Sequence, residues 1–226
     1  MYKKVPSAVD SLIASGVKVI VVRGAGDDAF GAGSDISEFE TLRTPDNAHA
    51  YDDAEADAHE SIEKSPVPTI AMINGPCRGG GLAIALACDL RYASDTATFA
   101  APPAKLGIAF PHPAVKALAK TIGDAHARYL LLTATTIDAK EASRIGLLHH
   151  VTSSSSLTTT VAELTAQICK LAPQSLTAAK VSLAAVKSHT SSTEVQNAIK
   201  KCYESDDYQE GITAFLEKRS PDFNGT

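Results

Sequence analysis

The stretch Pro76–Asp89, PCRGGGLAIALACD, places three consecutive glycines directly before an uncharged run, Leu82–Cys88. A helix that is apolar on every side must lie in the core, so this run predicts a buried helix that begins at the glycines. The preceding segment, residues 68–75 (PTIAMING), has the length and β-branched content of a buried strand. Free backbone N–H groups at the positive end of a buried helix can hold an oxygen that gains negative charge. Alternatively, the three glycines only let the helix pack closely against a strand.

A second glycine-rich loop follows another predicted strand, residues 17–24 (VKVIVVRG), and ends in Gly31–Ile36 (GAGSDI). Two N–H groups from these two loops together would form an oxyanion hole, which stabilises a carbonyl oxygen that becomes negative. The same region contains G-x-G-x-x-A, which imitates a dinucleotide-binding fingerprint. However, Asp27 and Asp28 would face the pyrophosphate, and the loop continues where the fingerprint needs a helix to start.

Short predicted strands alternate with predicted helices along the first two thirds of the chain, which is typical of an α/β fold. The serine and threonine runs within residues 153–160 favour turns and caps, and residues 161–220 are rich in helix formers. The sequence therefore predicts an α/β core over residues 1–152 and a C-terminal helical region over residues 153–226.

Composition excludes several classes of protein. The chain has 226 residues, a formal net charge of -5 and four widely spaced cysteines with no CxxC pair. No basic cluster is interleaved with aromatic residues, so nucleic acid is not an expected partner. No apolar stretch reaches the length of a membrane span, and no signal peptide is recognisable, so we expect a cytoplasmic protein without a membrane partner. The seven histidines form no HxH or HExxH motif, and no metal site is expected.

Five motifs occur in series along the whole chain. They are AFGAGSDISEF, PTIAMINGPCRGGGLAIALACDLRYAS, FAAPPAKLGIAFP, DAKEASRIGLLHHV and SDDYQEGITAFLEKRSPDF. In this order they resemble the crotonase, or enoyl-CoA hydratase/isomerase, superfamily. The resemblance implies a spiral of ββα units, C-terminal helices that make trimer contacts, and homotrimers that often pair into hexamers. It also implies an acyl-CoA thioester as substrate, with coenzyme A as part of that substrate and no separate cofactor.

The resemblance assigns the oxyanion-hole donors to the backbone N–H groups of Ser34 and Gly80. Their neighbours Ala32, Asp35 and Ile36 are expected to contact the substrate. Arg78 stands where relatives usually have an apolar residue, and it is a candidate to pair with a carboxylate or a phosphate of the substrate. A solvated or salt-bridged arginine is the alternative.

Two further candidates lie near the C-terminus: Lys218 and Phe223 match positions that contact the nucleotide end of coenzyme A in the family. Relatives also carry a strand pair before the helix that opens this chain, and that segment contributes to their coenzyme A site. Either this sequence starts late relative to these relatives, or the edge of the sheet and part of that pocket are missing.

Two departures from the family pattern concern catalysis. Hydratases of this family carry glutamates at positions where this sequence has Ala83 and Pro103. Water addition to an enoyl group needs an acid and a base, and neither residue can transfer a proton. His112, at a predicted helix start, is the candidate replacement, because an imidazole titrates near neutral pH. Alternatively, His112 is only a cap or a packing residue.

The expected function is therefore that of an enoyl-CoA hydratase/isomerase family enzyme, a lyase or isomerase, in which ordinary hydration is doubtful. One alternative is an inert protein that binds coenzyme A. A serine hydrolase acting through Ser34 is a weaker one, because Ala32 and Ile36 break the G-x-S-x-G pattern. The acidic helix predicted within residues 51–63 is expected to be a solvated face, unless Glu60 or Glu63 approaches a pocket.

Overall fold

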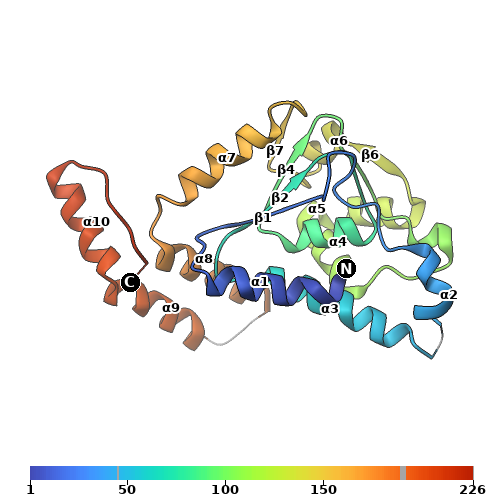
Figure 1. Ribbon diagram of the computed structural model, residues 1–226, viewed down its shortest axis with the longest axis horizontal. Helices are drawn as coiled ribbons and strands as arrows, with labels where there is room; N and C mark the ends of the chain where they lie inside the picture. Colours follow the sequence, from blue (N-terminus) through green and yellow to red (C-terminus); the bar gives the residue numbers. More distant parts are fainter. Residues whose placement is uncertain (45, 189–191, 226) are drawn as a thin grey trace. The chain divides into compact units, whose positions relative to one another are not determined.

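The computed structural model describes residues 1–44, 46–188 and 192–225 (Figure 1). The chain divides into two compact units. The first comprises residues 1–15, 21–65 and 69–161, and the second comprises residues 16–20, 66–68 and 162–226. No helix in the described ranges is both long enough and apolar enough to cross a membrane.

A four-stranded sheet forms the centre of the first unit, with the strand order β1-β2-β4-β7. The strands are β1 (Ile20–Arg23), β2 (Thr69–Ile73), β4 (Leu90–Ser94) and β7 (His150–Thr152). Strand β4 pairs in parallel with β2 and with β7. Every residue of β2 is buried, as its uninterrupted apolar sequence predicts.

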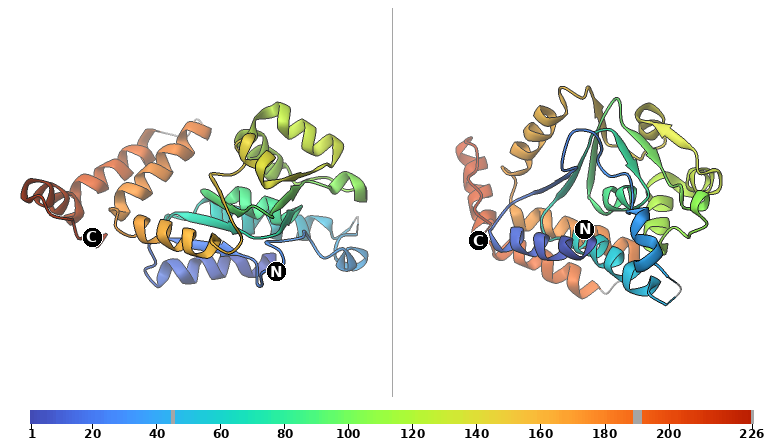
Figure 2. Two further views of the ribbon diagram at one scale, coloured as in Figure 1. Left: turned by 90° about the horizontal axis from the view of Figure 1, so that it is seen from above. Right: turned by 45° about the vertical axis from the view of Figure 1, so that its right-hand side comes forward.

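A second sheet has the order β3-β5-β6 and contains β3 (Pro76–Arg78), β5 (Thr98–Ala100) and β6 (Thr136–Asp138). Strands β3 and β5 pair in parallel, whereas β5 and β6 are antiparallel. Twice in succession the chain runs through a strand of the first sheet, a strand of the second sheet and then helix, as β2-β3-α4 and as β4-β5-η3-α5. These segments, residues 69–133, run from teal to yellow-green in Figure 2. This repeated ββα order agrees with the predicted spiral.

Helices surround these sheets in the first unit. They are η1 (Tyr2–Lys4), α1 (Val5–Ala14), η2 (Ile36–Glu38), α2 (Phe39–Leu42), α3 (Ala48–Glu63), α4 (Gly80–Ala87), η3 (Pro103–Leu106), α5 (His112–Thr133) and α6 (Ala139–Arg144). All eight residues of α4 are buried, which confirms the helix predicted after the glycines. Gly123 interrupts α5 with a φ of 77°, which lies outside the helical region.

Arg91 fixes the far end of α4. Its guanidinium donates to the carbonyl oxygens of Cys88 at 2.7 Å and Leu147 at 2.9 Å, and its side chain is buried. A cation at the carboxyl end of a helix is favourable, because the helix dipole is negative there. Helix α4 is thus anchored at the end opposite to its glycines.

The helices after β7 are α7 (Leu157–Ile168), α8 (Pro173–Ser188), α9 (Ser192–Glu204) and α10 (Asp206–Glu217). Thr158, Thr159 and Thr160 belong to the first turn of α7, so the turn predicted over residues 153–160 extends only to the serines. The hydroxyl of Ser153 bonds with Ser155 and Ser156, which closes that turn.

The second unit contains an open groove of about 620 Å³ that is lined mainly by apolar side chains of α9, α10 and the C-terminal segment. After α10, Arg219 forms two hydrogen bonds with the carboxylate of Glu210, at 2.6 and 2.7 Å. Glu210 also accepts from the backbone N–H of Asp222, and these bonds lower the pKa of Glu210 to about 2. They hold the chain folded back along α10.

Candidate functional site

The loop after β1 crosses the start of α4 in the first unit. The backbone N–H groups of Phe30 and Gly31 both donate to the oxygen of Pro76 at 3.1 Å, and the oxygen of Gly31 accepts from Arg78 at 2.8 Å. Gly31 also forms a parallel bridge with Cys77. Because these bonds flank the glycine triplet, they bring the two loops singled out in the sequence together. We call this place the glycine crossing, defined by Gly31–Ser34 and Gly79–Gly81.

The crossing depends on residues without a Cβ. A Cβ built on Gly81 would lie 2.8 Å from the carbonyl carbon of Gly31 and closer still to its oxygen. Gly79, the N-cap of α4, has a φ of 53°, a conformation that favours glycine. Close packing of the helix start, the alternative interpretation of the triplet, therefore holds for Gly81. The role of Gly80 as an oxyanion donor stays a prediction.

The backbone N–H groups of the crossing differ in whether they have a hydrogen-bond acceptor. The N–H of Gly79 donates to Ala100 at 3.1 Å. For the N–H groups of Ser34 and Gly80, however, no acceptor is found within the described ranges. Gly80 is the first residue of α4, where an N–H has no partner inside the helix. These are the two donors that the family resemblance assigns.

The side chain of Tyr2 occupies the space in front of Gly80. A Cβ built on Gly80 would lie 3.1 Å from the Cζ of Tyr2 and closer still to its hydroxyl oxygen. The same hydroxyl lies 3.4 Å from the Oγ of Ser34. Burial raises the pKa of Tyr2 to about 12, so the phenol is neutral at neutral pH. The Tyr2 hydroxyl thus lies beside both Ser34 and Gly80.

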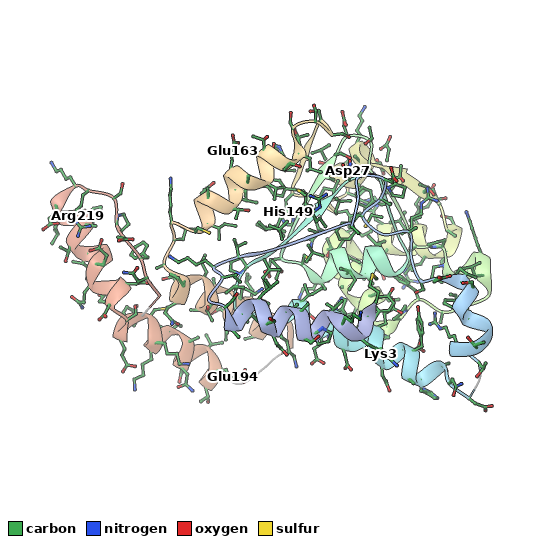
Figure 3. All side chains as sticks on the ribbon, viewed as in Figure 1. Lys3, Asp27, His149, Glu163, Glu194 and Arg219 are labelled. Carbon is green, nitrogen blue, oxygen red and sulfur yellow. The ribbon has the colours of Figure 1, made fainter. Side chains whose placement is uncertain are left out.

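A carboxylate that the sequence prediction missed faces the same glycine. The Oε1 of Glu55, on α3, lies 3.2 Å from the Cβ position of Gly80, and Glu55 is only 5% exposed. Glu55 shares the buried face of α3 with Ala58, His59 and Ile62. This i, i+3, i+4, i+7 spacing was readable in the sequence and could have placed Glu55 on the inner face. Helix α3 packs against both α4 and η1; Lys3 marks η1 in Figure 3.

Ala83 and Pro103, the two positions at which the resemblance implies a missing glutamate, both lie in the first unit. Ala83 is buried in α4, one turn after Gly79, and Pro103 is buried at the start of η3. His112 is exposed at the start of α5, and within the described ranges no hydrogen bond or ion pair joins it to the glycine crossing. Its role as acid or base stays a prediction.

The remaining predicted residues are distributed as follows. Ala32 is exposed within the crossing, and Asp35 and Ile36 are exposed directly after it. Asp35 caps η2 by accepting from the N–H of Ser37. The Nε of Arg78 is buried and has no hydrogen-bond partner among the described residues. Lys218 and Phe223 belong to the second unit, where Lys218 ends α10 and Phe223 lines the groove. Their contribution to substrate binding stays a prediction.

The loop that imitates a dinucleotide-binding fingerprint does not form one. No helix begins at Ala29, and the next helical element is η2 at Ile36. Asp27, labelled in Figure 3, forms an ion pair with Arg23 on the wall of an open pocket of about 350 Å³. Without a helix N-terminus after the strand, the loop cannot hold a pyrophosphate in the way the fingerprint requires.

The glycine crossing lies in a fold that is known from other proteins. Residues 8–226 match the family model described as Enoyl-CoA hydratase/isomerase. The methylmalonyl-CoA decarboxylase of Escherichia coli is 32% identical over 216 residues, covering 92% of this chain and 82% of the relative. The short-chain-enoyl-CoA hydratase of Clostridium acetobutylicum is 34% identical over 211 residues, covering 91% of this chain and 79% of the relative.

Solved structures agree with the sequence comparison. A crystal structure of an enoyl-CoA hydratase/isomerase family protein from Hyphomonas neptunium has a TM-score of 0.95 and 32% identity, covering 100% of this chain and 88% of that protein. An enoyl-CoA hydratase/carnithine racemase from Magnetospirillum magneticum has a TM-score of 0.93 and 32% identity, and the match covers 100% of this chain and 86% of that protein. The chain belongs to the enoyl-CoA hydratase/isomerase family, and the predicted crotonase-like fold is confirmed.

Proposed function

We propose that this chain binds an acyl-CoA thioester and holds the thioester oxygen between the backbone N–H groups of Ser34 and Gly80. The observation that carries the proposal is the pair of N–H groups at the glycine crossing that have no acceptor among the described residues, with the hydroxyl of Tyr2 beside both residues. A thioester oxygen would take the place of that hydroxyl. Fixed donors stabilise such an oxygen most when it becomes an enolate oxygen, because its negative charge develops during the reaction.

The reaction that follows from this site does not begin with removal of a proton by a glutamate. Ala83 and Pro103 stand at the positions where family hydratases carry their acid and base, so we expect poor hydration of an enoyl thioester. Loss of carbon dioxide from a thioester with a carboxylate on its α-carbon needs no base. The bond between the α-carbon and the carboxylate breaks, its electron pair forms the enolate, and carbon dioxide leaves.

Decarboxylation is supported by two observations. One relative is named a methylmalonyl-CoA decarboxylase. In addition, Arg78, next to the triplet, has a buried Nε without a partner among the described residues. A guanidinium can donate two parallel hydrogen bonds to a carboxylate, and it would orient the leaving group of a malonyl-type thioester. We therefore propose decarboxylation of such a thioester as the reaction.

The second unit is proposed to have two roles: binding of coenzyme A and association of copies of the chain. Lys218 and Phe223 are the proposed contacts for the nucleotide end of coenzyme A. Helix α10 exposes large apolar side chains, with Phe215 83% and Leu216 74% exposed, which supports association of copies into a trimer or hexamer. Light scattering coupled to size-exclusion chromatography would measure the mass of the particle, and a monomer would contradict the assembly.

The test of the proposed function is a comparison of thioesters on the purified protein. Calorimetry should detect binding of propionyl-CoA, and mass spectrometry should detect conversion of methylmalonyl-CoA into propionyl-CoA. Crotonyl-CoA hydration should be far slower than in a hydratase with both glutamates. Comparable hydration would contradict the proposed reaction, and binding without turnover of any enoyl, dienoyl or malonyl thioester would indicate an inert binding protein. Labelling of Ser34 by a fluorophosphonate would instead indicate a serine hydrolase.

A further inference from the structure

Glu55 is a buried acid with a perturbed pKa. A carboxyl group is seldom as buried as the 5% exposure of Glu55, unless it is paired or functional. Burial raises the pKa of Glu55, and the nearby Asp52 raises it further, whereas the Arg43 guanidinium lowers it. Arg43 is itself engaged, since it pairs with Asp52 at 2.7 Å and lies over the rings of Phe39 and Tyr51. Near neutral pH, a larger fraction of Glu55 is therefore protonated than of an ordinary glutamic acid.

The carboxyl group faces the reacting end of the proposed substrate. Its Oε1 lies 3.2 Å from the Cβ position of Gly80, and Gly80 is one of the two proposed oxyanion donors. The α-carbon of a thioester is bonded to the carbonyl carbon, so it lies within a few ångströms of the oxygen that Gly80 would bind. Glu55 comes from α3 and the donors come from two other segments, and only the tertiary fold brings them together.

Resting on the proposed function, we infer that Glu55 delivers the proton to the α-carbon of the enolate held by Ser34 and Gly80. The enolate electron pair forms the new C–H bond, and the O–H bond of Glu55 breaks. The carbonyl of the product thioester is restored, and Glu55 is left as a carboxylate that takes a proton from water. In the reverse direction, the Glu55 carboxylate removes an α-proton from the product.

Other ionisable groups fit this role less well. Tyr2 also faces Gly80, but a phenol with a pKa of about 12 is a weak proton donor, and its carboxyl neighbour is the stronger acid. His112 is exposed, with no bond to the crossing in the described part of the chain. His59 is buried on the same face of α3, and burial lowers its pKa, so it is mainly neutral and a poor acid.

The test is exchange of the α-hydrogens of propionyl-CoA in D₂O, followed by mass spectrometry, together with calorimetric binding of the same thioester. We expect Glu55→Gln to reduce exchange by about 100-fold, while its Kd stays within about threefold of the wild-type value. Asp57→Asn is the matched control, because Asp57 is an exposed acid two residues away on α3. It should behave as the wild type in both measurements.

Other results of the exchange experiment would contradict the role of Glu55 or the proposed function. Unchanged exchange in Glu55→Gln overturns the inference. The inference also fails if Tyr2→Phe or His112→Ala loses exchange while Glu55→Gln still exchanges the α-hydrogens. If Glu55→Gln does not fold, Glu55→Asp moves the carboxyl group back by one methylene and should slow exchange at least tenfold with binding retained. Equal exchange in Glu55→Asp would then contradict the inference. A wild-type protein that neither binds propionyl-CoA nor exchanges its hydrogens overturns the proposed function itself.

Discussion

Gly31 and Gly81 are in direct backbone contact: a Cβ built on Gly81 would lie 2.8 Å from the carbonyl carbon of Gly31. The contact joins the loop that contains Ser34 to the first turn of α4. Since backbone atoms cannot move aside as the end of a side chain can, this pair of glycines determines how closely the loop and the helix start approach each other.

Gly81→Ala should destabilise the protein by about 2 to 3 kcal/mol, because the loop and the helix must separate to accept the methyl group. Urea denaturation monitored by circular dichroism would measure the loss. Gly26→Ala is the matched control, because a Cβ at Gly26 meets no atom within 4 Å. Equal stability of the two variants would mean that the contact is not required.

Gly80→Ala should affect ligand binding more than stability. Its methyl group meets the hydroxyl of Tyr2, the end of a side chain that can turn away, and would then remain where the thioester oxygen has to enter. We expect a Kd for propionyl-CoA at least about tenfold higher, equivalent to about 1.4 kcal/mol, with a nearly unchanged urea midpoint. Wild-type affinity in this variant would remove Gly80 from the proposed site.

Tyr2→Phe should bind the thioester more tightly. The hydroxyl of Tyr2 lies 3.4 Å from Ser34 Oγ, and the incoming oxygen has to displace it. Removing one such hydrogen bond from the free protein should lower the Kd of propionyl-CoA by about threefold, as measured by calorimetry. Tyr129→Phe, at an exposed position of α5, is the control. Weaker binding in Tyr2→Phe would mean that the hydroxyl assists the ligand.

Glu55 should make stability depend on pH. Burial raises the folded-state pKa of this acid above its ordinary value, so the folded state keeps the proton more firmly than the unfolded state. Stability is therefore lost as pH rises from about 4.5 through the folded pKa, with about 1.4 kcal/mol for each unit of difference. Glu55→Gln cannot ionise and should avoid this loss.

Thermal melts between pH 4 and pH 8 would check this expectation. The melting temperature of Glu55→Gln should approach that of the wild type at pH 4 and exceed it at pH 8. Arg43 and Asp52 are the charged neighbours of Glu55, and both remain in this variant. A difference that does not change with pH would show that Glu55 does not ionise in this range. Asp57→Asn should show no such pH-dependent gain.

Much of the fold was predictable because it depends on local patterns. The apolar run after the glycines predicted a buried helix, and the β-branched runs predicted buried strands. The motifs in series indicated the family. The boundary near Thr158 was harder to predict, because threonines tolerate both a turn and the first turn of a helix. Gly123 marked a helix break, although the two halves of α5 continue without a loop between them.

The sequence by itself determined the two glycine loops and the absence of acids at positions 83 and 103. Only the tertiary structure decided which groups face Gly80. Tyr2 and Glu55 are far from the triplet along the chain, and their proximity depends on how η1 and α3 pack against α4. Burial then separates Glu55 from the exposed acids of the same helix. Local sequence does not reveal that difference, because the pKa of a carboxyl group depends on the side chains and the solvent around it.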